Sequence, residues 1–219
     1  MTNMSQRISV VFTGLLIAGC ARDHAPDPPT GYQIPANIHY SDQWVSTPAV
    51  DLMSADGTFI RAFFEAVDVQ RNNSNGMKGS YPGFGKANET GRNDSDVGDD
   101  EDIYGYAGRW VLNFTINPDN TATAIVCEYI SVKTDKREAN IGESDILTYH
   151  RVGAAPPRNQ KGPARAPATS VFGDWYASGY DFLQSPDVKK NATGCLPPNQ
   201  PPIDKGSVST PGWPASEGN

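Results

Sequence analysis

The sequence predicts an α+β domain in which one amphipathic helix packs on an antiparallel β-meander, with long irregular loops and one disulfide. Apolar residues recur at helical spacing over residues 54–70, and residues 109–116 alternate between apolar and polar side chains before a turn. The C-terminal half contains two cysteines that could pair with each other. With 37% hydrophobic residues, 18 prolines and 21 glycines, the composition indicates one modest core with long irregular segments.

The first twenty residues have the pattern of an export signal. Arg7 is the only charged residue before Cys20, and residues 8–17 form an almost continuous apolar run. This run is too short to span a bilayer, which takes roughly twenty apolar residues. The segment ends in Ile-Ala-Gly-Cys at 17–20.

This ending resembles the lipobox of bacterial lipoproteins, in which an aliphatic residue and two small residues precede an invariant cysteine. The resemblance implies that residues 1–19 are a signal peptide and that Cys20 becomes a lipid-attachment site carrying acyl chains such as palmitate. Two acyl chains make a stable anchor. The expected location is therefore the cell membrane, at its extracytoplasmic face. An ordinary signal peptide with an incidental cysteine is the alternative.

Residues 20–37 are expected to form a tether, because they contain four prolines and show no apolar periodicity. A lipobox followed by a proline-rich tether and one domain resembles uncharacterised lipoproteins of high-GC Gram-positive bacteria. Removing residues 1–19 takes only Arg7 from the 18 basic residues, so the formal net charge changes from −7 to −8. Nucleic acids and anionic membrane faces are bound through basic residues, so neither is an expected partner. The membrane is expected to be reached only through the lipidated N-terminus.

The helix over residues 54–70 begins at a capping residue, either Ser54 or Asp56. Its apolar stripe predicts packing against the core rather than a ligand site. The residues of this stripe are Phe59, Ile60, Phe63, Phe64 and Val67.

A run of acidic residues over 94–102 suits calcium, because hard cations take carboxylate oxygens. The EF-hand spacing fails, since Gly105 stands where the bidentate Glu belongs. A solvated acidic loop is favoured, and cation binding there stays open. The three histidines show no ligand spacing, so neither a metal nor a cofactor is expected.

The clearest strand signal is a hairpin formed by residues 109–116 and 121–132 around a turn at 117–120. On the face expected to meet the helix, the predicted pairs are Trp110–Cys127, Leu112–Ile125 and Phe114–Thr123, with Ile116 beyond them. On the other face Arg109 opposes Glu128, which suggests an exposed ion pair. The predicted core therefore sets the helix stripe on Trp110, Leu112, Phe114 and Ile125.

Further along the chain, a third strand is expected at residues 146–152, after a polar connection over 133–144. Residues 153–168 read as an irregular crossover, and residues 171–176 as an edge strand. The single domain is expected to cover residues 38–195. Proline and serine dominate residues 196–219, which are expected to be disordered.

Cys127 and Cys195 are predicted to form a disulfide. They are the only two thiols left once Cys20 carries lipid, and the compartment reached by export is oxidising. Two unrelated thiols are the alternative.

The sequence contains none of the common hydrolase, zinc-protease or phosphate-loop motifs, and no catalytic residue is assigned. The helix string Ala-Phe-Phe-Glu-Ala-Val-Asp at 62–68 and the later strands resemble NTF2-like and SnoaL-like cone folds. That resemblance implies a pocket between sheet and helix, and some members are isomerases or cyclases with an Asp or His base.

The favoured hypothesis is a surface-anchored, non-enzymatic envelope lipoprotein that binds a protein partner or a small ligand. One alternative is a small NTF2-like pocket enzyme with His150 or Glu128 as its base. The pocket candidates are His150, Trp110 and Tyr129. Another alternative is a phage-encoded lipoprotein that excludes superinfecting phage.

Overall fold

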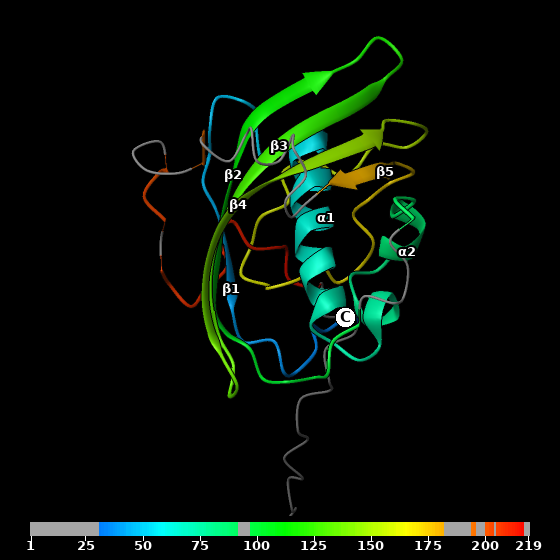
Figure 1. Ribbon diagram of the computed structural model, residues 1–219. Helices are drawn as coiled ribbons and strands as arrows, with labels where there is room; N and C mark the ends of the chain where they lie inside the picture. Colours follow the sequence, from blue (N-terminus) through cyan, green and yellow to red (C-terminus); the bar gives the residue numbers. More distant parts are fainter. Residues whose placement is uncertain (1–30, 92–96, 182–193, 196–199, 204, 217–219) are drawn as a thin grey trace, which may run out of the picture.

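The computed structural model describes residues 31–91, 97–181, 194–195, 200–203 and 205–216. One long helix lies against a sheet whose long strands bend around it (Figure 1). The helical segments are α1 (Ala55–Arg71), the 3-10 turn η1 (Gly76–Gly79) and α2 (Phe84–Ala87). The strands are β1 (Ser41–Trp44), β2 (Tyr104–Ile116), β3 (Thr121–Lys133), β4 (Glu138–His150) and β5 (Tyr176–Asp181).

The strands form one five-stranded sheet in the order β1-β2-β3-β4-β5. Strands β2 to β5 are an antiparallel meander, as predicted, and β1 adds to β2 in parallel. The predicted α+β class and the helix are therefore confirmed. No helix among the described residues combines the length and apolar composition needed to cross a bilayer. Residues 17–20, the predicted lipobox, lie outside the described part of the chain.

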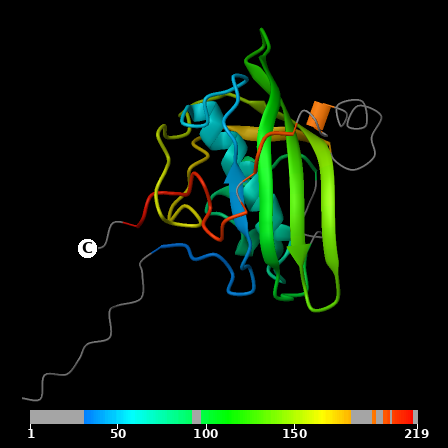
Figure 2. The same ribbon diagram turned by 90° about the vertical axis from the view of Figure 1, so that its left-hand side faces the viewer.

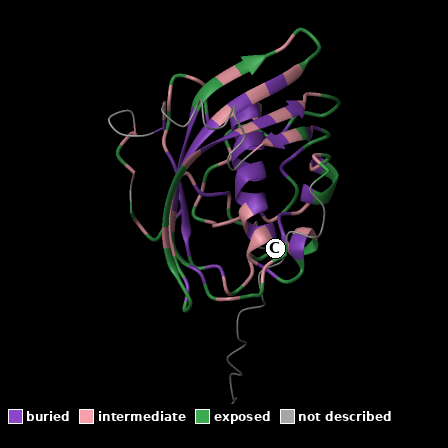
Figure 3. Ribbon diagram, in the orientation of Figure 1, coloured by how far each residue is buried: buried purple, intermediate pink, exposed green. Residues whose placement is uncertain are grey.

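Helix α1 is capped as its sequence indicates. The Ser54 hydroxyl accepts a hydrogen bond from the Gly57 amide at 3.0 Å, and Asp56 lies in the first turn. Of its 17 residues 14 are buried, so the polar face of the helix is covered as well as the apolar stripe (Figure 3). Burial on both faces means that Arg61 and Glu65 need polar partners inside the protein.

The hairpin register is right at its centre and wrong beyond it. Arg109 lies opposite Glu128 and Trp110 opposite Cys127, as predicted. A β-bulge between Val111 and Asn113 then shifts the pairing by one residue. As a result Asn113, not Leu112, opposes Ile125, and Phe114 opposes Ala124 rather than Thr123.

The predicted core used the wrong face of the hairpin. Trp110 packs with Cys127 and Cys195 in a separate cluster, and Leu112 is 38% exposed. Ile116 is also exposed, and Ile125 is only half-buried. The helix aromatics share their cluster instead with Val111, Ala122, Ala124, Val126, Leu147 and Tyr149. Phe114 reaches that cluster because the bulge carries it to the helix side. We call the face beneath α1 the inner face of the sheet and the opposite face the outer face.

Several expected boundaries also move. Strand β4 starts at Glu138, so the predicted polar connection over 133–144 is mostly strand, and β5 lies at Tyr176–Asp181 rather than at 171–176. Residues 153–168 are irregular, as predicted.

The expected disordered tail is wrong for much of its length. Trp213 is completely buried, and the Trp44 amide donates to the Thr210 carbonyl at 2.7 Å. The C-terminal residues (red) thus lie along the free edge of β1 (blue), as Figure 2 shows. Near the other end, the Tyr32 hydroxyl donates to the Gly79 carbonyl at 2.9 Å, so the domain starts before residue 38.

Candidate functional site

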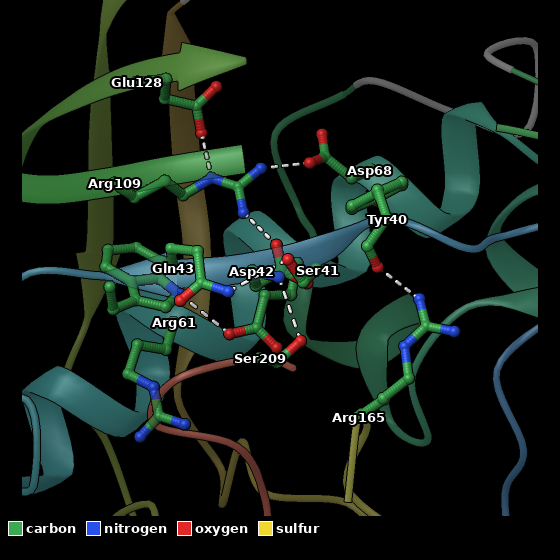
Figure 4. Close-up of polar contacts among 12 residues, drawn as sticks. Tyr40, Ser41, Asp42, Gln43, Arg61, Asp68, Arg109, Glu128, Arg165 and Ser209 are labelled. Carbon is green, nitrogen blue, oxygen red and sulfur yellow. Dashed lines mark hydrogen bonds and ion pairs between the residues drawn. The ribbon is translucent and has the colours of Figure 1, made fainter. Parts of the chain in front are cut away.

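A network of charged side chains is buried on the inner face, with Arg109 of β2 at its centre (Figure 4). The guanidinium contacts three carboxylates: its Nε meets Glu128 of β3 at 2.5 Å, its Nη1 meets Asp42 of β1, and its Nη2 meets Asp68 of α1. One side chain therefore joins three strands to the helix. The expectation of an exposed Arg109–Glu128 pair is wrong, because this side of the hairpin faces α1.

Two further carboxylates lie beside Glu128. One oxygen each from Glu128, Glu143 and Asp145 lie within 4.8 Å of one another. Asp145 is 1% exposed and accepts a hydrogen bond from the Tyr180 hydroxyl at 3.0 Å. Its other oxygen, Oδ1, is buried and has no hydrogen-bond partner among the described residues. We call Glu128, Glu143 and Asp145 the carboxylate cluster.

The strand register explains why these side chains meet. Glu128 of β3 lies directly opposite Glu143 of β4, and Asp145 is two residues further along β4 on the same face. Like charges in opposite positions repel each other. Arg71, in the last turn of α1, is the nearby basic residue whose charge lowers the pKa of Glu143 and Asp145.

Burial dominates the electrostatics of the carboxylate cluster. It raises the pKa of Glu128 and takes that of Asp145 well above its ordinary value, and the neighbouring carboxylates add to the shift of Asp145. For Glu143, which is half-buried, burial and the charge of Glu128 raise the pKa to about 7. The cluster can therefore hold protons near neutral pH, and its three oxygens are the ligands that hard cations prefer.

A second buried network serves a structural purpose. Glu65 of α1 accepts hydrogen bonds from Trp44 Nε1 at 2.9 Å, the Tyr81 hydroxyl at 2.8 Å and Trp213 Nε1 at 2.6 Å. One turn earlier, the Arg61 guanidinium lies 4.4 Å from the centre of the Trp213 ring. These contacts fasten the C-terminal segment to the helix.

The outer face carries two shallow clefts that share Pro201. One, of about 680 Å³, is lined by Trp110, Leu112 and Pro48 among others. The other, of about 620 Å³, is lined by Tyr106, Tyr129 and Pro202 among others. Together they form an aromatic and proline-rich surface.

The predicted pocket residues are only partly brought together. Tyr129 packs against the cluster of Trp110, Cys127 and Cys195 on the outer face. His150 lies at the end of β4, stacked on Tyr176 with ring centres 4.7 Å apart, and lines neither of these clefts. Glu128 and His150, the two proposed bases, lie on opposite faces of the sheet because their β4 positions, 143 and 150, differ in parity.

The predicted disulfide is confirmed. Cys127 of β3 is joined to Cys195, with the two Cα atoms 5.3 Å apart. Cys20, the predicted lipid-attachment residue, lies outside the described residues.

In the described part of the acidic loop, the carboxylates contact other residues of the same chain. Asp99 pairs with Lys136 at 3.0 Å, and Asp102 pairs with His39 at 3.2 Å. Asp100 accepts from the Ser74 amide at 2.7 Å. Residues 94–96 lie outside the described part.

Sequence reasoning missed Asp42, Asp68, Glu143 and Asp145. The available signal was the alternation of residues 141–147, where acidic and apolar side chains share one face. That signal acquires meaning only when β4 is extended back to Glu138 and set opposite Glu128.

Comparison of the chain with protein-family models, with curated proteins and with solved structures found no match in any of the three.

Proposed function

We propose that this chain is an exported binding protein of the bacterial cell envelope, held at the extracytoplasmic face of the membrane by lipid on Cys20. The observation that carries the proposal is the Cys127–Cys195 disulfide. Disulfides persist in oxidising compartments outside the cytoplasm. The Ile-Ala-Gly-Cys sequence at 17–20, after a short apolar run, supports lipidation at the same destination.

The binding surface that we propose is the outer face of the sheet. Tyr106 and Tyr129 lie with ring centres 6.3 Å apart, beside the cleft that contains Trp110. Tyrosine and tryptophan combine a large apolar ring with a polar group and are enriched where proteins bind one another. The two clefts adjoin at Pro201 and together make one longer surface, so an extended segment of a protein partner is the ligand that suits it best.

A non-enzymatic role is favoured over a pocket enzyme. Glu128 forms an ion pair with Arg109, so its carboxylate is not free to act as a general base. His150 lies on the other side of the sheet and stacks on Tyr176. The two residues considered as bases therefore belong to different surroundings.

The anchor is tested by replacing Cys20 with Ala in cells fed an alkyne-bearing fatty acid. The natural chain should carry the label and sediment with membranes, and Cys20→Ala should lose the label and leave the membrane fraction or accumulate as precursor. The double variant Cys127→Ala/Cys195→Ala is the control and should keep its label. Full labelling of Cys20→Ala would sink the proposal.

The outer face is tested with a photo-crosslinking residue placed at Tyr129 in intact cells. One discrete adduct is expected there, and the additional change Tyr106→Ala should reduce it. Placement at Val152, which is 43% exposed and lines neither cleft, is the control. Equal adducts from both positions would refute a specific partner at this face.

A further inference from the structure

The carboxylate cluster joins β3 and β4 on the inner face, next to the network through which Arg109 contacts Asp68 of α1. We propose that Glu128, Glu143 and Asp145 form a divalent-cation site and that calcium is its occupant.

The spacing of the oxygens fits one calcium ion. They lie within 4.8 Å of one another, and calcium–oxygen bonds of about 2.3–2.6 Å allow ligands on opposite sides of the ion to be roughly 5 Å apart. Magnesium has bonds of about 2.0–2.1 Å, which limits opposite ligands to roughly 4 Å. Calcium can therefore bind oxygens that are up to 4.8 Å apart, whereas magnesium requires the three oxygens to lie closer together.

A separate observation points to a missing ligand. Asp145 is 1% exposed, and its Oδ1 is buried without a hydrogen-bond partner in the described part of the chain. The other oxygen of this carboxylate is held by the Tyr180 hydroxyl at 3.0 Å. Buried polar atoms are nearly always paired, because an unpaired one loses its interaction with water and gains nothing. A cation bound by Oδ1 would remove that deficit.

The charge around the cluster points the same way. Arg109 is shared among Asp42, Asp68 and Glu128, and neither Glu143 nor Asp145 is one of its ion-pair partners. Arg71 is the second basic group that acts on the cluster. Among the described residues, five carboxylates thus face two guanidiniums in a mostly buried region. Buried charges require a counter-charge, so the excess must be met by cations or by protons.

Access and affinity are consistent with a weak site. Glu143 is half-buried, so one ligand lies where the cluster meets solvent. Calcium sites of extracellular modules bind at roughly 10⁻⁴–10⁻³ M, well below the affinity of intracellular buffers. An exported protein needs no tighter site, although binding itself does not depend on export.

The test uses the full-length protein in detergent micelles, stripped with EDTA and titrated with terbium as a luminescent substitute for calcium. Tyr180, bonded to Asp145, should sensitise the ion. We expect saturable luminescence that millimolar calcium chloride displaces. Glu143→Gln and Asp145→Asn should each weaken terbium binding at least tenfold. Glu143→Gln alters a half-buried side chain and keeps its shape, so it remains informative if Asp145→Asn fails to fold.

Two variants control for binding elsewhere. Asp174→Asn changes an exposed carboxylate that pairs with Lys86, and Asp99→Asn changes the acidic loop. Both should bind terbium as the natural chain does. Absence of saturable binding at 10 mM calcium or terbium overturns the proposal and assigns the excess charge to protons. An affinity lost in Asp99→Asn but kept in Glu143→Gln overturns it too.

Discussion

Arg109 neutralises three carboxylates at the centre of the buried charged network. Its side chain is completely buried and contacts carboxylates from β1, β3 and α1. Breaking a buried ion pair on one side leaves an uncompensated charge in a region with little water. The guanidinium therefore stabilises the packing of the helix on the sheet chiefly by neutralising its neighbours.

Replacing Arg109 with Met should lower the free energy of unfolding by about 3–5 kcal/mol, because Asp42, Asp68 and Glu128 lose their shared partner. Urea unfolding followed by tryptophan fluorescence measures the change. Lys136→Met is the matched control, since Lys136 pairs with Asp99 at the surface. Comparable stability of the two variants would show that the network is not buried as described.

The raised pKa of Glu143 predicts how the stability of the folded protein depends on pH. Its pKa is raised from 4.5 to about 7 in the folded protein, so between these values the folded state holds a proton that the unfolded state has released. Stability should therefore be highest below about pH 4.5 with respect to this group and fall as pH rises to about 7. Burial acts in the same direction on Glu128 and Asp145.

This dependence is measured by thermal unfolding at pH 5 and pH 8 in EDTA. The melting temperature should be lower at pH 8, and Glu143→Gln should reduce the difference because its amide does not titrate. A higher melting temperature at pH 8, unchanged by Glu143→Gln, would contradict the assignment.

At the scale of elements, the disulfide attaches residue 195 to the central strand, and the C-terminal segment covers one edge of the sheet. The disulfide ties residue 195 to the outer face of β3, and residues 205–216 cover the free edge of β1. An uncovered edge strand offers unpaired backbone groups to other chains, so this cover also limits aggregation.

The double variant Cys127→Ala/Cys195→Ala should be less stable by about 2–4 kcal/mol. The bridge closes a loop across a sequence separation of 68 residues, and a loop of that size restricts the unfolded chain strongly. Urea midpoints of the variant and of the oxidised natural chain give the difference. Equal midpoints, with both thiols of the natural chain free to alkylate, would show that no bridge forms.

Trp213→Ala should cost about 3–5 kcal/mol, the usual range for removing a buried tryptophan. It also removes a hydrogen bond to Glu65 and the ring beneath Arg61. Val208→Ala is the control, because Val208 is 63% exposed in the same segment. Rapid proteolysis of the C-terminal segment in Trp213→Ala alone would support its role. Equal resistance in both variants would argue against it.

At the scale of the whole molecule, the sequence predicted the features that depend on neighbouring residues or on composition. The helix and the centre of the hairpin followed from spacing and turn residues, and Ser54 was one of the two cap residues that the sequence offered. The disulfide followed from counting thiols. Each of these features lies within a short stretch of chain or depends on composition alone.

The remaining features depend on contacts between distant segments. Alternation alone did not show which face of the hairpin meets the helix: Trp110, before the bulge, lies on the outer face, and the bulge after Val111 moves Phe114 to the helix side. Trp213 was predicted to lie in a disordered tail because its partners are distant in sequence. Its hydrogen bond to Glu65 spans 148 residues, and the bond from Arg61 to the same segment spans 151. The buried cluster combines side chains from β3 and β4 whose opposition appears only once the sheet is assembled.

Export and lipid anchoring are tested together by intact-mass and peptide mass spectrometry of the protein extracted from bacterial membranes without reduction. We expect an N-terminal peptide that starts at Cys20 and carries a diacylglyceryl group, together with a peptide pair joined through Cys127 and Cys195. An N-terminus elsewhere with an unmodified Cys20, or reduced thiols at both other cysteines, would contradict an exported, lipid-anchored domain.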